Sequence, residues 1–231
     1  MKAPNLSFNR KALNVFTRIF YGTDLWLFDL DGTLIDSHAQ IADALEITIL
    51  EAEVRPPEKS KIKSVIGLSL EQMLVELKIP RNKHDFIQTK FRSRLQEEVS
   101  KGSTLLLPGV EEALSKLRIA EKKIAIATNK PTELAESIVR NSNLMSYIQY
   151  VSGSTSQKPK PNPGILENSI AALGGKSPVM VGDRPEDTIA AKQLKIYSIQ
   201  VFSKLSRYSS YQDADLYLES MLDLVNLLRK L

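Results

Sequence analysis

Short apolar runs that end in polar residues limit most strongly how this chain can fold. A run of about four to eight apolar residues is typical of a strand buried on both faces of a sheet. The clearest runs, each with the residues that follow it, are 25–28 with Asp29, 124–127 with Thr128, and 179–181 with Gly182 and Asp183. The run 196–201 predicts a fourth strand, and the runs 147–151 and 216–218 are weaker strand candidates.

Helical patterns lie between these predicted strands. They cover 109–117, 131–140, 163–173, 186–194 and 222–231. Strands that alternate with helices predict an open parallel sheet with helices on both faces, a Rossmann-like α/β core. Such sheets bind ligands beyond the carboxyl ends of their strands. The polar residues that follow the apolar runs would therefore share one edge of the sheet.

The segment 38–104 breaks the alternation. It contains no convincing strand, but helical patterns cover 41–53, 58–65, 69–77 and 82–100. Ser69 and Gln72 have the spacing of a capping box, which marks a helix start. We therefore expect an all-helical cap domain at 38–104, inserted into a catalytic core made of 1–37 and 105–231.

Composition excludes several classes of function. The 231 residues include no cysteine, so disulfides, thiolate metal sites and cysteine nucleophiles are ruled out. No apolar run approaches the roughly 18 residues that a membrane span needs, and no basic stripe interleaved with aromatics indicates nucleic-acid binding. We expect a cytoplasmic protein. A transit peptide stays an alternative, because residues 1–23 contain no acid.

The strongest chemical signal is the pair Asp29 and Asp31, followed by Gly32. Two carboxylates at the end of a buried strand are costly unless a cation neutralises them. Gly32 supplies the backbone freedom for a turn that brings both carboxylates to one ligand. Taken alone, the motif fits a solvated turn equally well, because Asp and Gly are common turn residues.

Three further segments favour a functional site. Thr128 and Asn129 end the second strand, where a hydroxyl and backbone amides can hold phosphate oxygens. Lys158 lies in a stiff, proline-bounded segment, and Asp183 and Asp187 follow the third strand. Each alone fits an ordinary strand end, surface lysine or helix cap. Together they place hard oxygen ligands, which select Mg²⁺, beside groups suited to a phosphate.

These motifs resemble those of the haloacid dehalogenase superfamily. The matching positions are Asp29-x-Asp31-Gly32-Thr33 for its first motif, Thr128 for the second, Lys158 for the third, and Gly182-Asp183-x-x-x-Asp187 for the fourth. The helical insert and the Thr-Asn-Lys-Pro pattern at 128–131 are similar to the phosphoglycolate phosphatase-like branch. The resemblance implies a Mg²⁺-dependent phosphatase that acts on a small phosphorylated metabolite.

The resemblance also implies roles for the acidic residues. Asp29 would attack phosphorus and form an aspartyl-phosphate, and Asp31 would serve as general acid and base. Mg²⁺ would be held by the Asp29 carboxylate, the Asp31 backbone carbonyl and Asp183. Asp187 would lie beside the metal without binding it, and would position the metal's water ligands or the lysine.

The remaining motif residues would contact the phosphate. Thr128 and Asn129 would hold a transferring oxygen, and Lys158 would pair with that oxygen and with Asp29. Gly32 and Thr33 are assigned to substrate binding. Threonine at position 33 favours hydrolysis, since phosphomutases of this type more often carry valine there.

Several alternatives stay open at this stage. A phosphomutase or a pyrophosphatase of the same superfamily would use the same residues, with phosphoglycolate as the first substrate candidate for a phosphatase. A signalling receiver domain also has a phosphoaspartate, but its acceptor follows a later strand. A non-catalytic scaffold is the most distant alternative. Arg184 would either contact the substrate phosphate or face solvent, and His38 would either reach the substrate or begin a helix.

Overall fold

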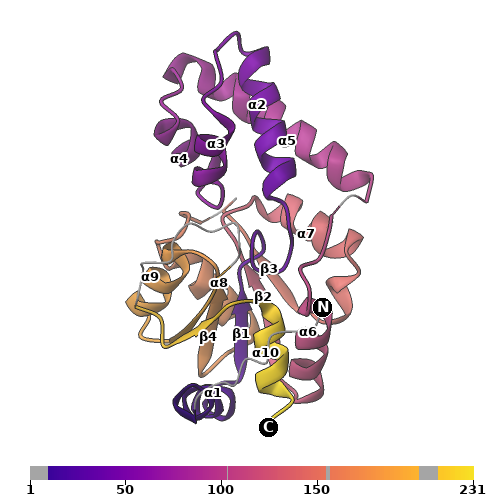
Figure 1. The fold of residues 1–231 in the computed structure, drawn as a ribbon, viewed down its shortest axis with the longest axis vertical. Helices are drawn as coiled ribbons and strands as arrows, with labels where there is room; N and C mark the ends of the chain where they lie inside the picture. The colour runs from indigo at the N-terminus through magenta and orange to yellow at the C-terminus, as the bar shows by residue number, and fades with distance from the viewer. Residues whose placement is uncertain (1–9, 103, 155–156, 203–212) are drawn as a thin grey trace.

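The fold is built on a six-stranded parallel sheet (Figure 1). The computed structural model describes residues 10–102, 104–154, 157–202 and 213–231. Its strands are β1 (Leu25–Phe28), β2 (Lys123–Ala127), β3 (Tyr150–Ser152), β4 (Pro178–Gly182), β5 (Tyr197–Val201) and β6 (Leu216–Leu218). Their order in the sheet is β3-β2-β1-β4-β5-β6, and every pairing is parallel.

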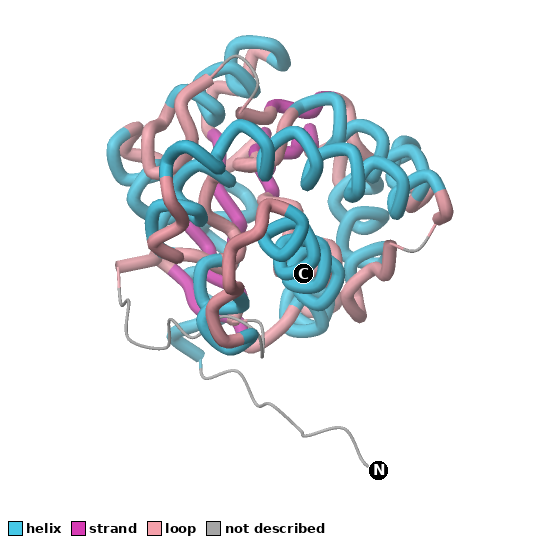
Figure 2. Tube along the Cα trace, turned by 90° about the horizontal axis from the view of Figure 1, so that it is seen from above, coloured by secondary structure: helices cyan, strands magenta, loops and turns pink. Residues whose placement is uncertain are grey.

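Helices cover both faces of this sheet, as the view in Figure 2 shows. The helices α8 (Gly164–Leu173) and α9 (Pro185–Gln193) pack on one face, against Leu25 and Leu27. The helices on the other face, against Trp26 and Phe28, are α1 (Arg10–Gly22), α6 (Val110–Ile119), α7 (Thr132–Asn141) and α10 (Met221–Leu228). The predicted α/β fold class is confirmed.

Helix α1 is held to the sheet by its apolar stripe. Phe16 and Ile19 are fully buried, and the Phe16 ring meets the Trp26 ring edge-on with centroids 6.3 Å apart. Burying an aromatic side chain of this size stabilises the folded state by about 1.5 to 3 kcal/mol. The N-terminal segment from residue 10 is therefore an integral part of the core layer.

A group of helices follows β1 and lies over the carboxyl edge of the sheet (Figure 1). These are α2 (His38–Glu51), α3 (Lys59–Val65), α4 (Leu70–Glu76) and α5 (His84–Ser100). The predicted capping box is present, because Gln72 N donates to Ser69 Oγ at 3.3 Å and Ser69 N donates to Gln72 Oε1 at 3.1 Å. Residues 1–9 and 103, at the predicted domain ends, lie outside the described residues.

The register of the sheet brings three strand ends level with one another. Phe28 at the end of β1 lies opposite Ile126 of β2 and Val181 of β4. The residues that follow these strands, Asp29, Thr128 and Asp183, therefore meet at one edge, as predicted from the topology of parallel sheets. Within the described ranges, no helix is long and apolar enough to cross a membrane.

Candidate active site

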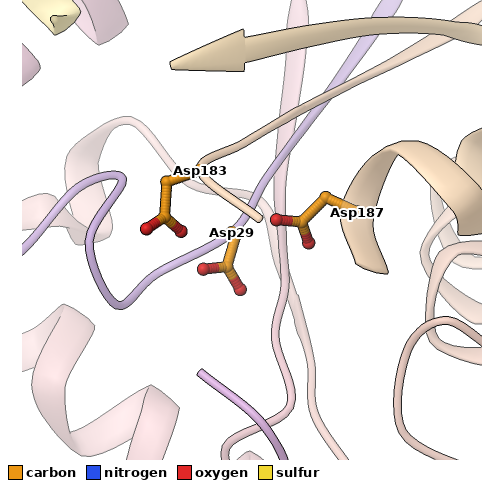
Figure 3. A group of neighbouring side chains, drawn as sticks. All are labelled: Asp29, Asp183 and Asp187. Atoms are coloured by element: carbon orange, nitrogen blue, oxygen red, sulfur yellow. The ribbon is translucent and has the colours of Figure 1, made fainter. Parts of the chain in front are cut away.

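Three aspartates converge where β1 and β4 end (Figure 3). Asp29 follows β1, Asp183 follows β4, and Asp187 lies in the first turn of α9. Their side chains are almost completely buried, and one carboxylate oxygen from each lies within 4.8 Å of the others. Burying three carboxylates side by side is unfavourable unless positive charge compensates them.

A buried lysine supplies part of that charge, and it is Lys160 rather than the predicted Lys158. The Lys160 ammonium donates to Asp29 Oδ1 at 2.7 Å, to Asp187 Oδ1 at 2.6 Å and to the Ala127 carbonyl at 2.7 Å. Its side chain is 2% exposed, whereas Lys158 is exposed to solvent. The placement predicted for Lys158 is therefore wrong by two residues.

The pKa values of this cluster reflect burial first and charge second. The pKa of Asp29 is raised to about 7. Burial is the largest cause of the rise, the Lys160 ammonium opposes it, and the Asp187 carboxylate adds to it. Burial also raises the pKa of Asp183 well above its ordinary value, with Asp29 as the next cause. Burial alone would lower the pKa of Lys160, but Asp187 and Asp29 outweigh it and raise that pKa.

The cluster fits a hard divalent cation at Asp29 and Asp183. Asp183 Oδ1 is buried and has no hydrogen-bond partner among the described residues. Both oxygens of Asp187 are already engaged, Oδ1 by Lys160 and Oδ2 by the Arg184 backbone N–H at 3.1 Å. The orphaned oxygen of Asp183 thus needs a ligand, while Asp187 orients its neighbours. Carboxylate oxygens of this kind suit Mg²⁺.

Asp31 lies on the turn that follows β1, beside two residues to which the sequence analysis assigned no role. Its Oδ2 is 3.1 Å from the Lys130 ammonium, and its Oδ1 accepts a hydrogen bond from Ser37 Oγ. Gly32 has φ +80°, and a Cβ there would lie 2.5 Å from Asp183 Oδ2. Glycine at this position therefore allows the turn to approach the aspartate cluster.

Thr128 and Asn129 lie on the loop after β2. The Thr128 N–H donates to the Ser152 carbonyl at 3.0 Å, and its hydroxyl oxygen accepts from the Lys130 N–H at 3.2 Å. Asn129 Oδ1 accepts from the Lys160 N–H at 2.7 Å, which fixes the loop that carries the buried lysine. This contact is tertiary, and no local sequence pattern announces it.

Two groups from these core loops also hold the segment between α3 and α4. Asn129 Nδ2 donates to the Gly67 carbonyl at 3.2 Å, and Arg184 donates through a terminal guanidinium N–H to the Ile66 carbonyl. Arg184 is buried and also donates to Glu186 at 3.1 Å, so it does not face solvent. His38 begins α2, as the helix-start interpretation predicts, and it does not line the pocket described below.

A pocket of about 400 Å³ opens between these loops and the overlying helices. Asp29, Asp31, Thr128 and Asn129 line its core side, and residues of α4 and α5 line the other. Gly32 and Thr33, assigned to substrate binding, are buried and are absent from the lining. The structure therefore does not bring position 33 to the pocket, and Thr33 Oγ1 has no hydrogen-bond partner within the described part of the chain.

Comparison with known proteins identifies the family. The model of the haloacid dehalogenase-like hydrolases matches residues 26–201, so the chain belongs to this family. It is 30% identical over 186 residues to a phosphoglycolate phosphatase of Agrobacterium fabrum, covering 77% of this chain and 79% of the relative. It is 29% identical over 184 residues to the "Probable phosphatase IndB" of Dickeya dadantii, covering 77% and 80%.

The fold comparison agrees with the sequence comparison. The crystal structure of a predicted phosphatase from Clostridium acetobutylicum superposes with a TM-score of 0.80 at 23% identity, covering 90% of this chain and 99% of that one. The predictions of the superfamily, of its phosphoglycolate phosphatase-like branch and of a phosphatase enzyme are therefore confirmed.

Proposed function

We propose that this protein hydrolyses small phosphomonoesters with Mg²⁺ through an aspartyl-phosphate at Asp29. The observation that carries the proposal is the contact of Asp29 with Lys160 beside the orphaned oxygen of Asp183. The Asp29 carboxylate lies next to the ammonium of Lys160, and the free oxygen of Asp183 offers a place for a metal cation beside it. Positive charge on both sides suits attack by Asp29 on a dianionic phosphate. Phosphoglycolate is the first compound to assay, since two of the relatives are named phosphoglycolate phosphatase.

Residues on the core loops supply the groups for both steps of the reaction. An Asp29 carboxylate oxygen bonds to phosphorus while the ester oxygen leaves, taking a proton from Asp31. Water then attacks the phosphorus of the aspartyl-phosphate, gives a proton to Asp31 and frees Asp29. Lys130 and Ser37 orient Asp31 for both transfers, through the contacts to its two carboxylate oxygens.

The other groups around the phosphate hold charge and position. Lys160 takes the role proposed for the motif lysine, and it pairs with the Asp29 oxygen throughout. Thr128 and the Asn129 amide hold a transferring oxygen. Asp29, Asp183 and the Asp31 backbone carbonyl would hold Mg²⁺, which supplies positive charge against the repulsion between carboxylate and phosphate. Asp187 keeps Lys160 in place through the 2.6 Å contact.

We propose further that 38–104 acts as a cap domain on a core of 1–37 and 105–231, in a cytoplasmic enzyme. The cap shields the site from water and shapes the choice of leaving group. A phosphomutase is the alternative within the family, and it would transfer the phosphoryl group to a second hydroxyl rather than to water.

The proposal is tested by phosphate release from p-nitrophenyl phosphate and phosphoglycolate, with Mg²⁺ and with excess chelator. We expect release that needs Mg²⁺ and that disappears in Asp29→Asn. Asp213→Asn, an exposed aspartate, serves as the matched control and should keep wild-type activity. Equal rates with chelator, or turnover by Asp29→Asn, would contradict the proposal. Isomerisation of a sugar phosphate without phosphate release would indicate the mutase.

A further inference from the structure

The far wall of the active-site pocket is largely apolar, although Glu71, Gln72 and Gln88 also line it. The residues of this wall that belong to the main hydrophobic core are Ile41, Met73, Phe91, Leu95 and Leu134. Each is at most 7% exposed, so each is fixed by packing from behind and offers only a small face to the pocket. They come from α2, α4, α5 and α7, and together they make a preformed apolar surface in the pocket that Asp29 and Asp31 also line.

The size of the pocket exceeds what a two-carbon leaving group needs. A volume of about 400 Å³ falls within the range of about 300 to 1,000 Å³ of pockets that enclose whole organic ligands. The glycolate part of phosphoglycolate takes the space of a few water molecules, at about 30 Å³ each. Glycolate would therefore leave much of the apolar wall unfilled.

One cationic side chain lies on the same side of the pocket. Arg92, on α5 beside Phe91, lines the pocket and is exposed. It has no ion pair or hydrogen bond among the residues that the structure describes, unlike the other lining cation, Lys130, which contacts Asp31. Gln88, one turn earlier, is already bonded to Glu71 at 2.6 Å. Arg92 is therefore the wall residue free to meet an anion.

We propose that the substrate is a phosphomonoester whose leaving group is apolar, ring-sized and acidic at the end remote from the phosphate. Phe91, Leu95 and Met73 contact the ring, and Arg92 pairs with the acidic group. This assignment rests on the proposed phosphatase function and adds the leaving-group class. It predicts that phosphoglycolate is a poor substrate compared with a larger ester of the same chemical reactivity.

A series of primary alkyl phosphates isolates this contribution, because their leaving groups have similar basicity. The probes are ethyl phosphate, 2-phenylethyl phosphate and 2-(4-carboxyphenyl)ethyl phosphate, with phosphoglycolate alongside. One methylene in a fitted hydrophobic pocket changes kcat/KM by about 10- to 200-fold. We expect the phenyl ester to exceed ethyl phosphate and phosphoglycolate by at least about 10-fold in kcat/KM, and the carboxylate to add a further gain of about 3-fold or more.

Variants on α5 assign the effect to named residues. Phe91→Leu should lower the phenylethyl-to-ethyl ratio of kcat/KM about 10-fold, whereas Phe86→Leu, on an exposed side chain of the same helix, should not change the ratio. Arg92→Gln should remove the gain from the carboxylate, and Lys90→Gln, also exposed on α5, should keep it. Ratios are compared because a general loss of activity cancels in them.

Failure of this inference differs from failure of the proposed function. If the wild type hydrolyses all the esters but prefers ethyl phosphate or phosphoglycolate, the leaving-group assignment is overturned and the phosphatase function stands. If Phe91→Leu and Phe86→Leu shift the ratio equally, the wall is not the recognition surface. If no ester releases phosphate, including p-nitrophenyl phosphate, the proposed function falls and this inference with it.

Discussion

Replacing Lys160 by methionine tests the correction that the structure makes to the sequence analysis. The Lys160 ammonium makes three contacts of 2.6 to 2.7 Å, to Asp29, Asp187 and the Ala127 carbonyl. Methionine keeps most of the volume and removes the charge. Breaking a buried ion pair by removing one partner costs about 3 to 5 kcal/mol, because the other charge stays buried without compensation.

The assay is urea unfolding at pH 8 without metal, with Lys158→Met as the matched control. Lys158→Met removes an exposed lysine two residues away, and exposed substitutions of this kind change stability by less than about 0.5 kcal/mol. We expect Lys160→Met to lower the free energy of unfolding by about 3 to 5 kcal/mol. Equal losses in the two variants, or a larger loss in Lys158→Met, would refute the placement of the lysine.

The deficit should also depend on pH in a defined direction. The pKa of Asp29 is raised to about 7 by burial in spite of the opposing Lys160 ammonium, so loss of the ammonium raises that pKa further. A carboxyl group with a raised pKa in the folded state contributes stability that is full below its unfolded pKa and lost as pH rises through the folded pKa. The deficit of Lys160→Met should therefore shrink as pH falls from 8 to 5.5.

Three further predictions concern metal, pH and the helical segment. Asp183→Asn should raise the Mg²⁺ concentration for half-maximal activity at least about 10-fold, and an unchanged requirement would remove Asp183 from the metal site. Because protons compete for Asp29 below about pH 7, Mg²⁺ should bind more tightly at pH 8 than at pH 5.5 in calorimetric titrations, with protons released on binding; tighter binding at pH 5.5 would contradict the raised pKa. Gly67→Ala should raise KM several-fold, because φ is +98° and a Cβ there would lie 2.2 Å from Arg184 Cδ; Gly174→Ala, at φ +61° with nothing within 4 Å, should show only the ordinary cost of a left-handed residue, about 1 to 2 kcal/mol, without the rise in KM.

The sequence was sufficient to predict the sheet edge and the acidic residues on it. Buried strands of a parallel sheet appear in the sequence as apolar runs, and their carboxyl ends share one edge of the sheet. The proximity of Asp29, Thr128 and Asp183 could therefore be predicted from the sequence alone. The two-residue spacing of the first motif, with Gly32, likewise indicated the turn that the structure contains.

The lysine and the pocket could not be predicted in this way. Lys158 and Lys160 lie in one proline-bounded loop, where no periodicity separates an inward from an outward side chain. The choice between them depends on Asn129, which binds the Lys160 backbone, and on Asp187. The apolar wall depends on how α4 and α5 pack above the core, and the contact between Lys130 and Asp31 joins residues 99 positions apart in the sequence.

The most direct test of the central claim is to find the phosphoryl group on the enzyme. Asp31→Asn, which keeps Asp29 but lacks the base for water attack, is mixed with p-nitrophenyl phosphate and Mg²⁺, quenched in acid and digested for peptide mass spectrometry. Nitrophenolate leaves with little protonation, so we expect a burst of about one equivalent and one phosphoryl group on the peptide that contains Asp29. A burst with no modified peptide, a phosphoryl group on another residue, or full turnover without accumulation would contradict the account.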